Sequence, residues 1–103
     1  MSFCPKSGPW SGCYEQCGCQ HQFQMNICFS GCSLSGSGCD QIGQFNINGT
    51  WNSCSGYVQF CKQYVCAPPV NYTGTIQSCG RVITGTYNAG GQCGGFNMSY
   101  KGC

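Results

Sequence analysis

Charged side chains are scarce in this chain of 103 residues. Lysine and arginine together number 4, aspartate and glutamate 2, and histidine 1, so charged residues make up 6% of the sequence, where about 25% is usual. A net charge of +2 on so few groups forms no basic stripe, which argues against nucleic acid or an anionic membrane as the main partner. So few acids and bases also leave little material for proton-transfer catalysis. We therefore expect no enzymatic activity and no cofactor.

Long apolar runs and helical periodicity are missing as well. No window approaches the roughly 18 consecutive apolar residues of a membrane-spanning helix, and we expect no membrane insertion. No segment repeats apolar residues at the spacing of an amphipathic helix. The first ten residues show no charged segment followed by an apolar one, so no secretory signal is visible in the chain as written.

Alternation with a period of two residues is the dominant pattern. Apolar residues and glycines share one parity, and the other parity holds mostly Gln, Asn, Ser, Thr and Cys. Because successive side chains of a strand point to opposite faces, each stretch predicts a strand with one apolar and one polar face. The eight stretches lie at residues 10–14, 23–29, 34–40, 45–51, 58–64, 70–76, 83–87 and 96–100.

The connections between these stretches are short and rich in turn-forming residues, which favours antiparallel neighbours in a meander. Glycines inside the stretches favour the bends that barrel closure requires. An open sheet would leave an apolar face and two unpaired edges, and rolling it up removes both. We predict an all-β fold: a small eight-stranded antiparallel up-and-down (meander) barrel at residues 10–103, after an N-terminal extension at residues 1–9.

Three short motifs resemble a known class of barrels. Gly49-Thr50-Trp51, Gly74-Thr75-Ile76 and Gly85-Thr86-Tyr87 resemble the G-T-W and G-T-Y strand signatures of avidin-like and lipocalin-like up-and-down barrels. The order and spacing of Trp10-x-Gly12-x-Tyr14, Gly36-x-Gly38-x-Asp40 and Val58-x-Phe60-x-Lys62-x-Tyr64 resemble a small eukaryotic barrel module, here enriched in cysteine. The resemblance implies the fold, and a fold alone assigns no chemistry.

Cysteine is the abundant reactive residue, with 13 copies. This is above the ~8–10% that marks a disulfide scaffold in a short secreted chain. It predicts a disulfide-stapled domain in an oxidising environment (extracellular, luminal or within a virion or particle), with a reduced cytosolic protein as the alternative. An odd number leaves one cysteine over for an intermolecular bond or a free thiol.

A meander also predicts where the cysteines gather, because alternate turns lie at opposite barrel ends. Bridged cysteines must have Cα atoms within about 7 Å, so disulfides are expected within an end, with the pairing left open. End A should collect Cys17, Cys19, Cys39, Cys66 and Cys93, and end B should collect Cys4, Cys32, Cys54, Cys79 and Cys103. Cys13, Cys28 and Cys61 have the polar parity of their strands and should face outward. Outward cysteines would cross-link neighbouring subunits; the alternative is that all but one are internal staples.

Zinc is a competing explanation for part of this cysteine content. Four soft ligands, Cys13, Cys17, Cys19 and His21, fall within nine residues. In an extended strand, however, Cys13 and Cys17 would stand about 13 Å apart. We therefore predict no metal and keep zinc at these four residues as the alternative.

Two further sets of residues are candidate sites. Asp40 and Lys62 share the apolar parity near one barrel end, which predicts a buried ion pair; the alternative is a polar anchor for a ligand in the barrel mouth. Glycosylation sequons begin at Asn48, Asn71 and Asn97, all on the outward parity.

The functional expectation follows from a filled interior and an uncharged exterior. The apolar side chains suffice to fill an eight-stranded barrel, and the outer face lacks the charge that keeps monomers apart. We expect a non-enzymatic, cysteine-rich structural subunit of a larger assembly (a particle, fibre, coat or multiprotein complex), joined to other protein subunits in part by intermolecular disulfides. The alternatives are a small secreted module that binds a glycan or small ligand at one barrel end, and a metal-binding or redox protein.

Overall fold

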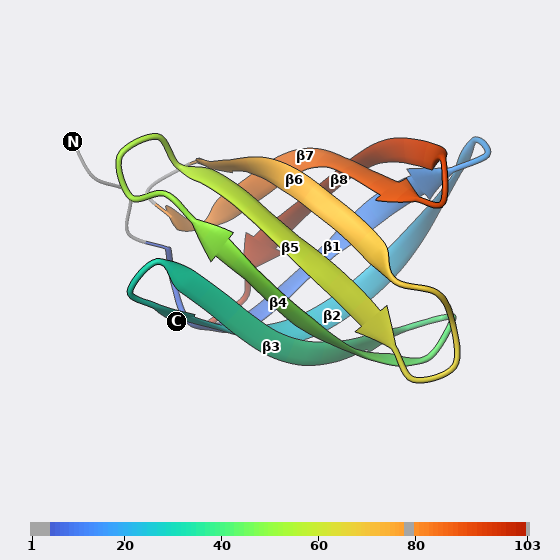
Figure 1. Cartoon of the computed structure of the whole chain (residues 1–103), viewed down its shortest axis with the longest axis horizontal. Coiled ribbons are helices and arrows are strands. Elements are labelled where there is room, and N and C mark those ends of the chain that lie inside the picture. The colour runs from blue at the N-terminus through green and yellow to red at the C-terminus, as the bar shows by residue number, and fades with distance from the viewer. Residues whose placement is uncertain (1–4, 78–79, 103) are drawn as a thin grey trace.

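The computed structural model describes residues 5–77 and 80–102, and in them the chain forms a closed antiparallel barrel (Figure 1). Each strand pairs with the next along the chain, and β8 pairs with β1 to close the wall. The prediction of an eight-stranded meander barrel is therefore confirmed. The strands are β1 (Gly8–Gln16), β2 (Cys19–Ser30), β3 (Ser33–Asp40), β4 (Gln44–Trp51), β5 (Tyr57–Tyr64), β6 (Val70–Gln77), β7 (Val82–Ala89) and β8 (Gln92–Tyr100). Within the described ranges, no helix is long and apolar enough to cross a membrane.

The barrel is elongated, measuring 36 × 22 × 21 Å. The connections that follow β1, β3, β5 and β7 lie at one end, on the right in Figure 1, and those that follow β2, β4 and β6 lie at the other. These are end A and end B respectively. Because strand direction alternates around the wall, residues distant in sequence share a rim.

The start of the barrel differs from the sequence-based boundary by two residues. Gly8 and Pro9 already pair with Ile27 and Asn26 of β2, so β1 begins at Gly8 and not at Trp10. The residues just before β1 also contact the barrel: the Trp10 indole N–H donates to the Lys6 carbonyl at 2.8 Å. Neither the backbone pairing nor this hydrogen bond produces an alternating apolar pattern in the sequence, so the earlier start of β1 could not be predicted from it.

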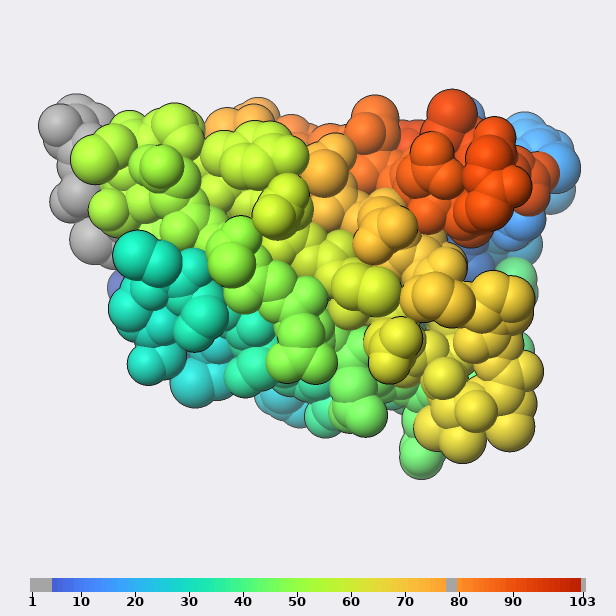
Figure 2. All heavy atoms as spheres, in the orientation of Figure 1, coloured from blue at the N-terminus to red at the C-terminus, as the bar shows by residue number. Residues whose placement is uncertain are grey.

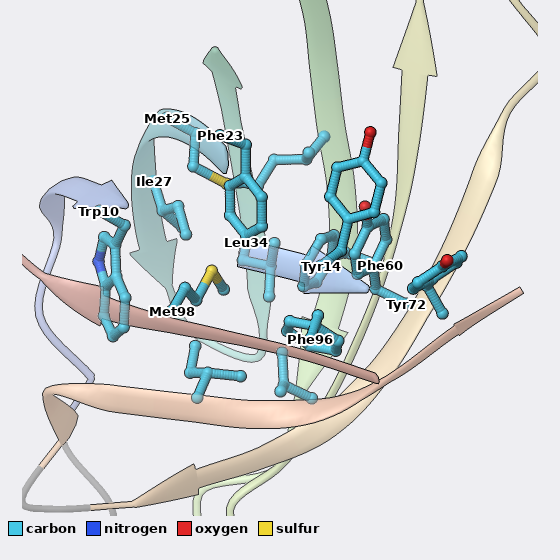
Figure 3. Packing of buried hydrophobic residues seen from close by; sticks show 14 of the residues in the cluster. Trp10, Tyr14, Phe23, Met25, Ile27, Leu34, Phe60, Tyr72, Phe96 and Met98 are labelled. Atoms are coloured by element: carbon cyan, nitrogen blue, oxygen red, sulfur yellow. The ribbon is translucent and has the colours of Figure 1, made fainter. Parts of the chain in front are cut away.

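The inward parity of the eight strands forms a continuous core. Figure 3 shows side chains from opposite walls meeting across the barrel axis. Phe60 stacks on Tyr72 with ring centroids 4.9 Å apart, and Phe96 meets Tyr72 edge-on at 5.0 Å, both favourable aromatic geometries. The buried hydrophobic residues are Trp10, Tyr14, Phe23, Met25, Ile27, Leu34, Phe45, Ile47, Val58, Phe60, Tyr72, Ile76, Ile83, Tyr87, Phe96 and Met98.

Glycine on the inward parity lets neighbouring strands approach closely enough for these large side chains to fit. Gly38 pairs with Met25 on one side and Phe45 on the other. A Cβ atom on Gly38 would lie 2.1 Å from the Gln24 carbonyl oxygen and 2.6 Å from the Met25 Cβ. The missing side chain is thus a packing requirement, because backbone atoms of β2 occupy its place.

Replacing Gly38 tests this requirement. We expect Gly38→Ala to lower the free energy of unfolding by roughly 2–4 kcal/mol, since β2 and β3 must separate to admit a methyl group. Gly95→Ala is the matched control, because a Cβ there meets only the Gly85 carbonyl oxygen at 3.8 Å and should change stability by less than about 0.5 kcal/mol. Urea unfolding measures both, and equal effects would contradict the close-approach argument.

Candidate functional site

A charged cluster lies at end A, built from β3 and β5, the two strands that flank β4. Asp40 ends β3, and Lys62 and Tyr64 lie on the inward parity of β5. The structure brings Asp40 and Lys62 together: Lys62 Nζ lies 3.2 Å from Asp40 Oδ2, and neither side chain has any solvent exposure. The Tyr64 hydroxyl donates to the same Asp40 oxygen at 2.5 Å. One carboxylate thus accepts hydrogen bonds from both β5 side chains.

The second oxygen of Asp40 organises the turn between β3 and β4. Asp40 Oδ1 accepts hydrogen bonds from the backbone N–H of Ile42 at 2.9 Å and of Gly43 at 3.4 Å. The Asp40 and Gly43 backbones also exchange two hydrogen bonds at 3.1 Å. These hydrogen bonds fix the Asp40 carboxylate independently of Lys62, which reduces the conformational entropy lost when the ion pair forms.

Aromatic rings surround the Lys62 ammonium within the barrel. Such contacts are favourable because the negative face of a ring attracts a cation. Burial nevertheless lowers the pKa of Lys62, and the Asp40 carboxylate opposes that shift. The distances from Nζ to the ring centroids are 4.4 Å for Phe45, 4.8 Å for Phe23, 4.9 Å for Tyr72, 5.3 Å for Tyr14 and 5.6 Å for Tyr64.

The tyrosines of this cluster stay neutral at ordinary pH. Burial raises the pKa of Tyr64, and the hydrogen bond to the Asp40 carboxylate raises it further. Burial likewise raises the pKa of Tyr72, with the Tyr14 and Asp40 charges adding to the effect. Neutral hydroxyls can donate to Asp40 but cannot serve as bases. Together with the full burial of Asp40 and Lys62, this makes the cluster a closed plug in which a ligand would first have to displace aromatic rings.

The four residues of the zinc alternative are not brought together. Cys13 lies half-buried on the outward parity of β1, whereas His21 packs against the Tyr14 ring with centroids 5.2 Å apart. Across residues 5–77 and 80–102, no group of three or more His, Cys, Asp or Glu side chains is arranged to hold a metal ion. The alternating geometry of β1 and β2 explains the separation, because it sends Cys13 and His21 to opposite faces.

The predicted disulfide staples do not appear in the described residues. Ten cysteines carry free thiols: Cys13 and Cys61 are half-buried, and Cys17, Cys19, Cys28, Cys32, Cys39, Cys54, Cys66 and Cys93 are exposed. The strand register gives one reason, since the cysteines inside the paired ladders face other residue types. Cys28 lies opposite Ser35, Cys39 opposite Gln24 and Gln44, and Cys61 opposite Asn48 and Asn71. Cys4, Cys79 and Cys103 lie outside the described residues.

The end-by-end grouping of the remaining cysteines follows the observed turns. Cys17 and Cys66 lie in end-A connections, Cys19 and Cys93 next to end-A connections, and Cys39 one residue before the end of β3. Cys32 and Cys54 lie in end-B connections. The three sequon asparagines, Asn48, Asn71 and Asn97, are exposed on the outer wall, in β4, near the start of β6 and in β8 respectively.

Tyr64 is the functional residue that the sequence interpretation missed. It shares the parity of Lys62 and follows it by two residues, so an inward position was readable. Its bond to Asp40 was not, because it depends on the register between β4 and β5, which pairs Phe45 with Tyr64. No protein-family model matches the chain, and a comparison with curated proteins finds no match. The resemblance to the barrel module stays a prediction.

Removing one partner of the Asp40–Lys62 pair should be costly. We expect Lys62→Met to lower the free energy of unfolding by about 3–5 kcal/mol, because it leaves the Asp40 carboxylate buried without its cation. In Asp40→Asn/Lys62→Met, which removes both charges, most of that loss should be recovered. Lys101→Met is the control at an exposed lysine. Denaturant unfolding measures all three, and a Lys62→Met protein as stable as the parent would refute the pairing.

Alkaline pH should destabilise the barrel through its buried tyrosines. A raised folded pKa contributes stability that is complete below the ordinary value of 10.0 and is lost as the pH rises above it. Lys62 acts in the opposite direction, but only up to its ordinary value of 10.5. Above that pH, Tyr72 should contribute a loss of roughly 1.4 kcal/mol per pH unit. Urea unfolding between pH 9 and 11 should show a shallower decline for Tyr72→Phe, and identical slopes would contradict this.

Proposed function

We propose that the protein is a non-enzymatic structural subunit of a larger assembly, such as a particle, fibre, coat or multiprotein complex. The observation that carries this proposal is the combination of a filled interior with an outer wall that bears few charges and several exposed thiols. The core side chains occupy the barrel axis, and the charged plug at end A is covered. Binding therefore falls to the outer surface.

Barrel closure restricts how neighbours can dock. Because β8 pairs with β1, the described wall has no free strand edge, and partners cannot add a strand by backbone pairing. Contacts must form through side chains of the wall or through the turns at the two ends. Figure 2 shows one side of that wall as a continuous surface formed largely by β3, β4, β5 and β6.

The side chains on this wall suit hydrogen-bonded contact between subunits. One row of register partners crosses β2 to β5 as Asn26, Ser37, Asn46 and Gln63. Amide side chains donate and accept at once, so each can bond with another polar wall without a complementary charge. A surface with few charges also lacks the repulsion that keeps copies apart. These features support association through the outer wall.

Exposed cysteines add a covalent means of fixing such contacts. Cys28 lies on the wall of β2, while Cys32 and Cys54 lie at end B and Cys66 at end A. Thiols at both ends and on the side of one barrel could link several neighbours in an oxidising environment. The proposal therefore includes intermolecular disulfides and an extracellular, luminal or particle-enclosed location.

The alternative of a small ligand-binding module needs an accessible polar site at a barrel mouth. Asp40 and Lys62 have no exposed side-chain surface, so the ion pair offers no accessible charge to a ligand at this mouth. Hollows are found on the outer wall, one of them lined by Ser11, Gln24 and Cys39. We therefore prefer the structural role.

Electrophoresis of native material with and without a reducing agent tests the assembly role. We expect a ladder or high-mass species that collapses to the 11.0 kDa chain when thiol is added, because thiol exchange cleaves accessible disulfides. Peptide mapping of the unreduced ladder should find intermolecular bonds at exposed cysteines such as Cys28, Cys32, Cys54 and Cys66. A compact monomer with only intramolecular bonds would overturn the proposal.

A further inference from the structure

The seam between β1 and β8 is where the two ends of the chain meet to close the barrel. Its register pairs Trp10 with Tyr100, Cys13 with Asn97 and Tyr14 with Phe96. The pairing ends at Tyr14 and Phe96, and extending its register three residues further, one past the end of β1 at Gln16, would set Cys17 opposite Cys93. Facing residues of antiparallel strands have Cα atoms about 4.5–5.5 Å apart, so a register continued this far would bring the two cysteines within the range that a disulfide bridges.

Side-chain contacts place Cys17 beside Gln92, the residue that precedes Cys93. The Gln16 amide donates to the Gln92 side-chain oxygen at 3.5 Å, and the Gln92 amide donates to the Cys17 sulfur at 3.6 Å. The Tyr87 hydroxyl bonds the Glu15 carbonyl across the same seam at 2.5 Å. Burial raises the pKa of Tyr87, and the nearby Cys17 and Cys93 thiols add to that increase. Both thiols therefore lie at one place on the end-A rim.

The two thiols are also accessible, and the backbone at Cys17 is unusual. Both side chains are exposed, so a soluble oxidant can reach them. Cys17 has a φ of +53°, the one positive φ outside glycine in the described residues. A non-glycine residue in this left-handed region carries some strain. The β1–β2 turn thus holds a cysteine at the seam where Gly or Asn would be the easier choice.

We propose that Cys17 and Cys93 form a redox-sensitive disulfide that locks the β1–β8 seam. With oxidised glutathione as oxidant, the Cys17 thiolate attacks one glutathione sulfur and displaces the other as a thiolate, which takes up a proton. The Cys93 thiolate then attacks the Cys17 sulfur of this mixed disulfide and displaces the second glutathione. Two cysteine thiols are oxidised and one glutathione disulfide is reduced to two thiols.

The position of this bond gives it a specific effect. It joins residues at opposite ends of the sequence, so it constrains a long segment of the unfolded chain. The bond also lies at the β1–β8 pairing, the one pair of neighbouring strands in the barrel that no short turn connects. Oxidation should therefore stabilise the closed barrel, and reduction should release the seam without removing a core side chain. This inference does not depend on the proposed assembly role.

Oxidation with glutathione disulfide followed by chymotryptic mapping tests the pairing. Cleavage after aromatic residues yields a segment at residues 15–23, with Cys17 and Cys19, and a segment at residues 88–96, whose cysteine is Cys93. We expect these segments to be linked in the oxidised, unreduced protein and separated by thiol. Cys19→Ser is the matched control and should keep the link, whereas Cys17→Ser should abolish it. An unlinked oxidised parent, or a link that persists in Cys17→Ser, would overturn the pairing.

Thermal unfolding tests the lock itself. In the Cys19→Ser protein, oxidation should raise Tm by roughly 10 °C over the reduced form. The same treatment of Cys17→Ser/Cys19→Ser should not reproduce that rise, which controls for disulfides formed elsewhere. A mapped Cys17–Cys93 link with no rise in Tm would refute the stabilising role of the bond.

Discussion

The barrel depends on fitting large side chains inside a wall of fixed, small circumference. Eight strands enclose a space just wide enough for side chains, and here that space must accept aromatic rings and methionines. Inward glycines make this fit possible: Gly49 lies opposite Phe60, and Gly12 lies opposite both Phe23 and Met98. A Cβ at either glycine would fall 2.0 Å from a neighbouring carbonyl oxygen. Large and small residues on adjacent strands therefore determine how closely the strands pack, and together they fill the interior.

Lys62 shows what a filled interior requires of a buried charge. An ammonium in a filled barrel cannot reach water, so its electrostatic environment must come from the protein. Asp40 supplies the counter-charge at 3.2 Å, and aromatic faces supply the remainder of its surroundings. A buried pair of this kind adds little net stability compared with apolar packing, yet it is costly to break on one side. The pair therefore acts on the conformation of the chain: Asp40 must lie beside β5, and this requirement fixes the position of the β3–β4 turn at end A.

Alternation in the sequence was enough to predict the strands, their faces and the antiparallel meander, because a period of two residues is a local property. It also placed Asp40 and Lys62 at the same end of the interior. The contacts that depend on register were beyond it. The Tyr64 bond to Asp40 and the proposed pairing of Cys17 with Cys93 require knowing which residues face each other across strands, and turn geometry and closure set that register. The cysteine content likewise predicted disulfide staples that do not appear in the described residues, because composition does not say whether two thiols face each other.

Closure of the wall connects the interior to the proposed role. A meander of eight strands has seven turns that hold neighbours together, but the pairing of β1 with β8 has only hydrogen bonds and side chains to hold it. The Tyr87 hydroxyl bonded to the Glu15 carbonyl and the glutamines at positions 16 and 92 already reinforce this seam near end A. The proposed assembly role would need that seam to stay shut, since an opened barrel would expose its apolar face and two strand edges to uncontrolled association. The proposed Cys17–Cys93 bond and the cysteines spread over the wall would then serve two different purposes, one within the chain and one between copies.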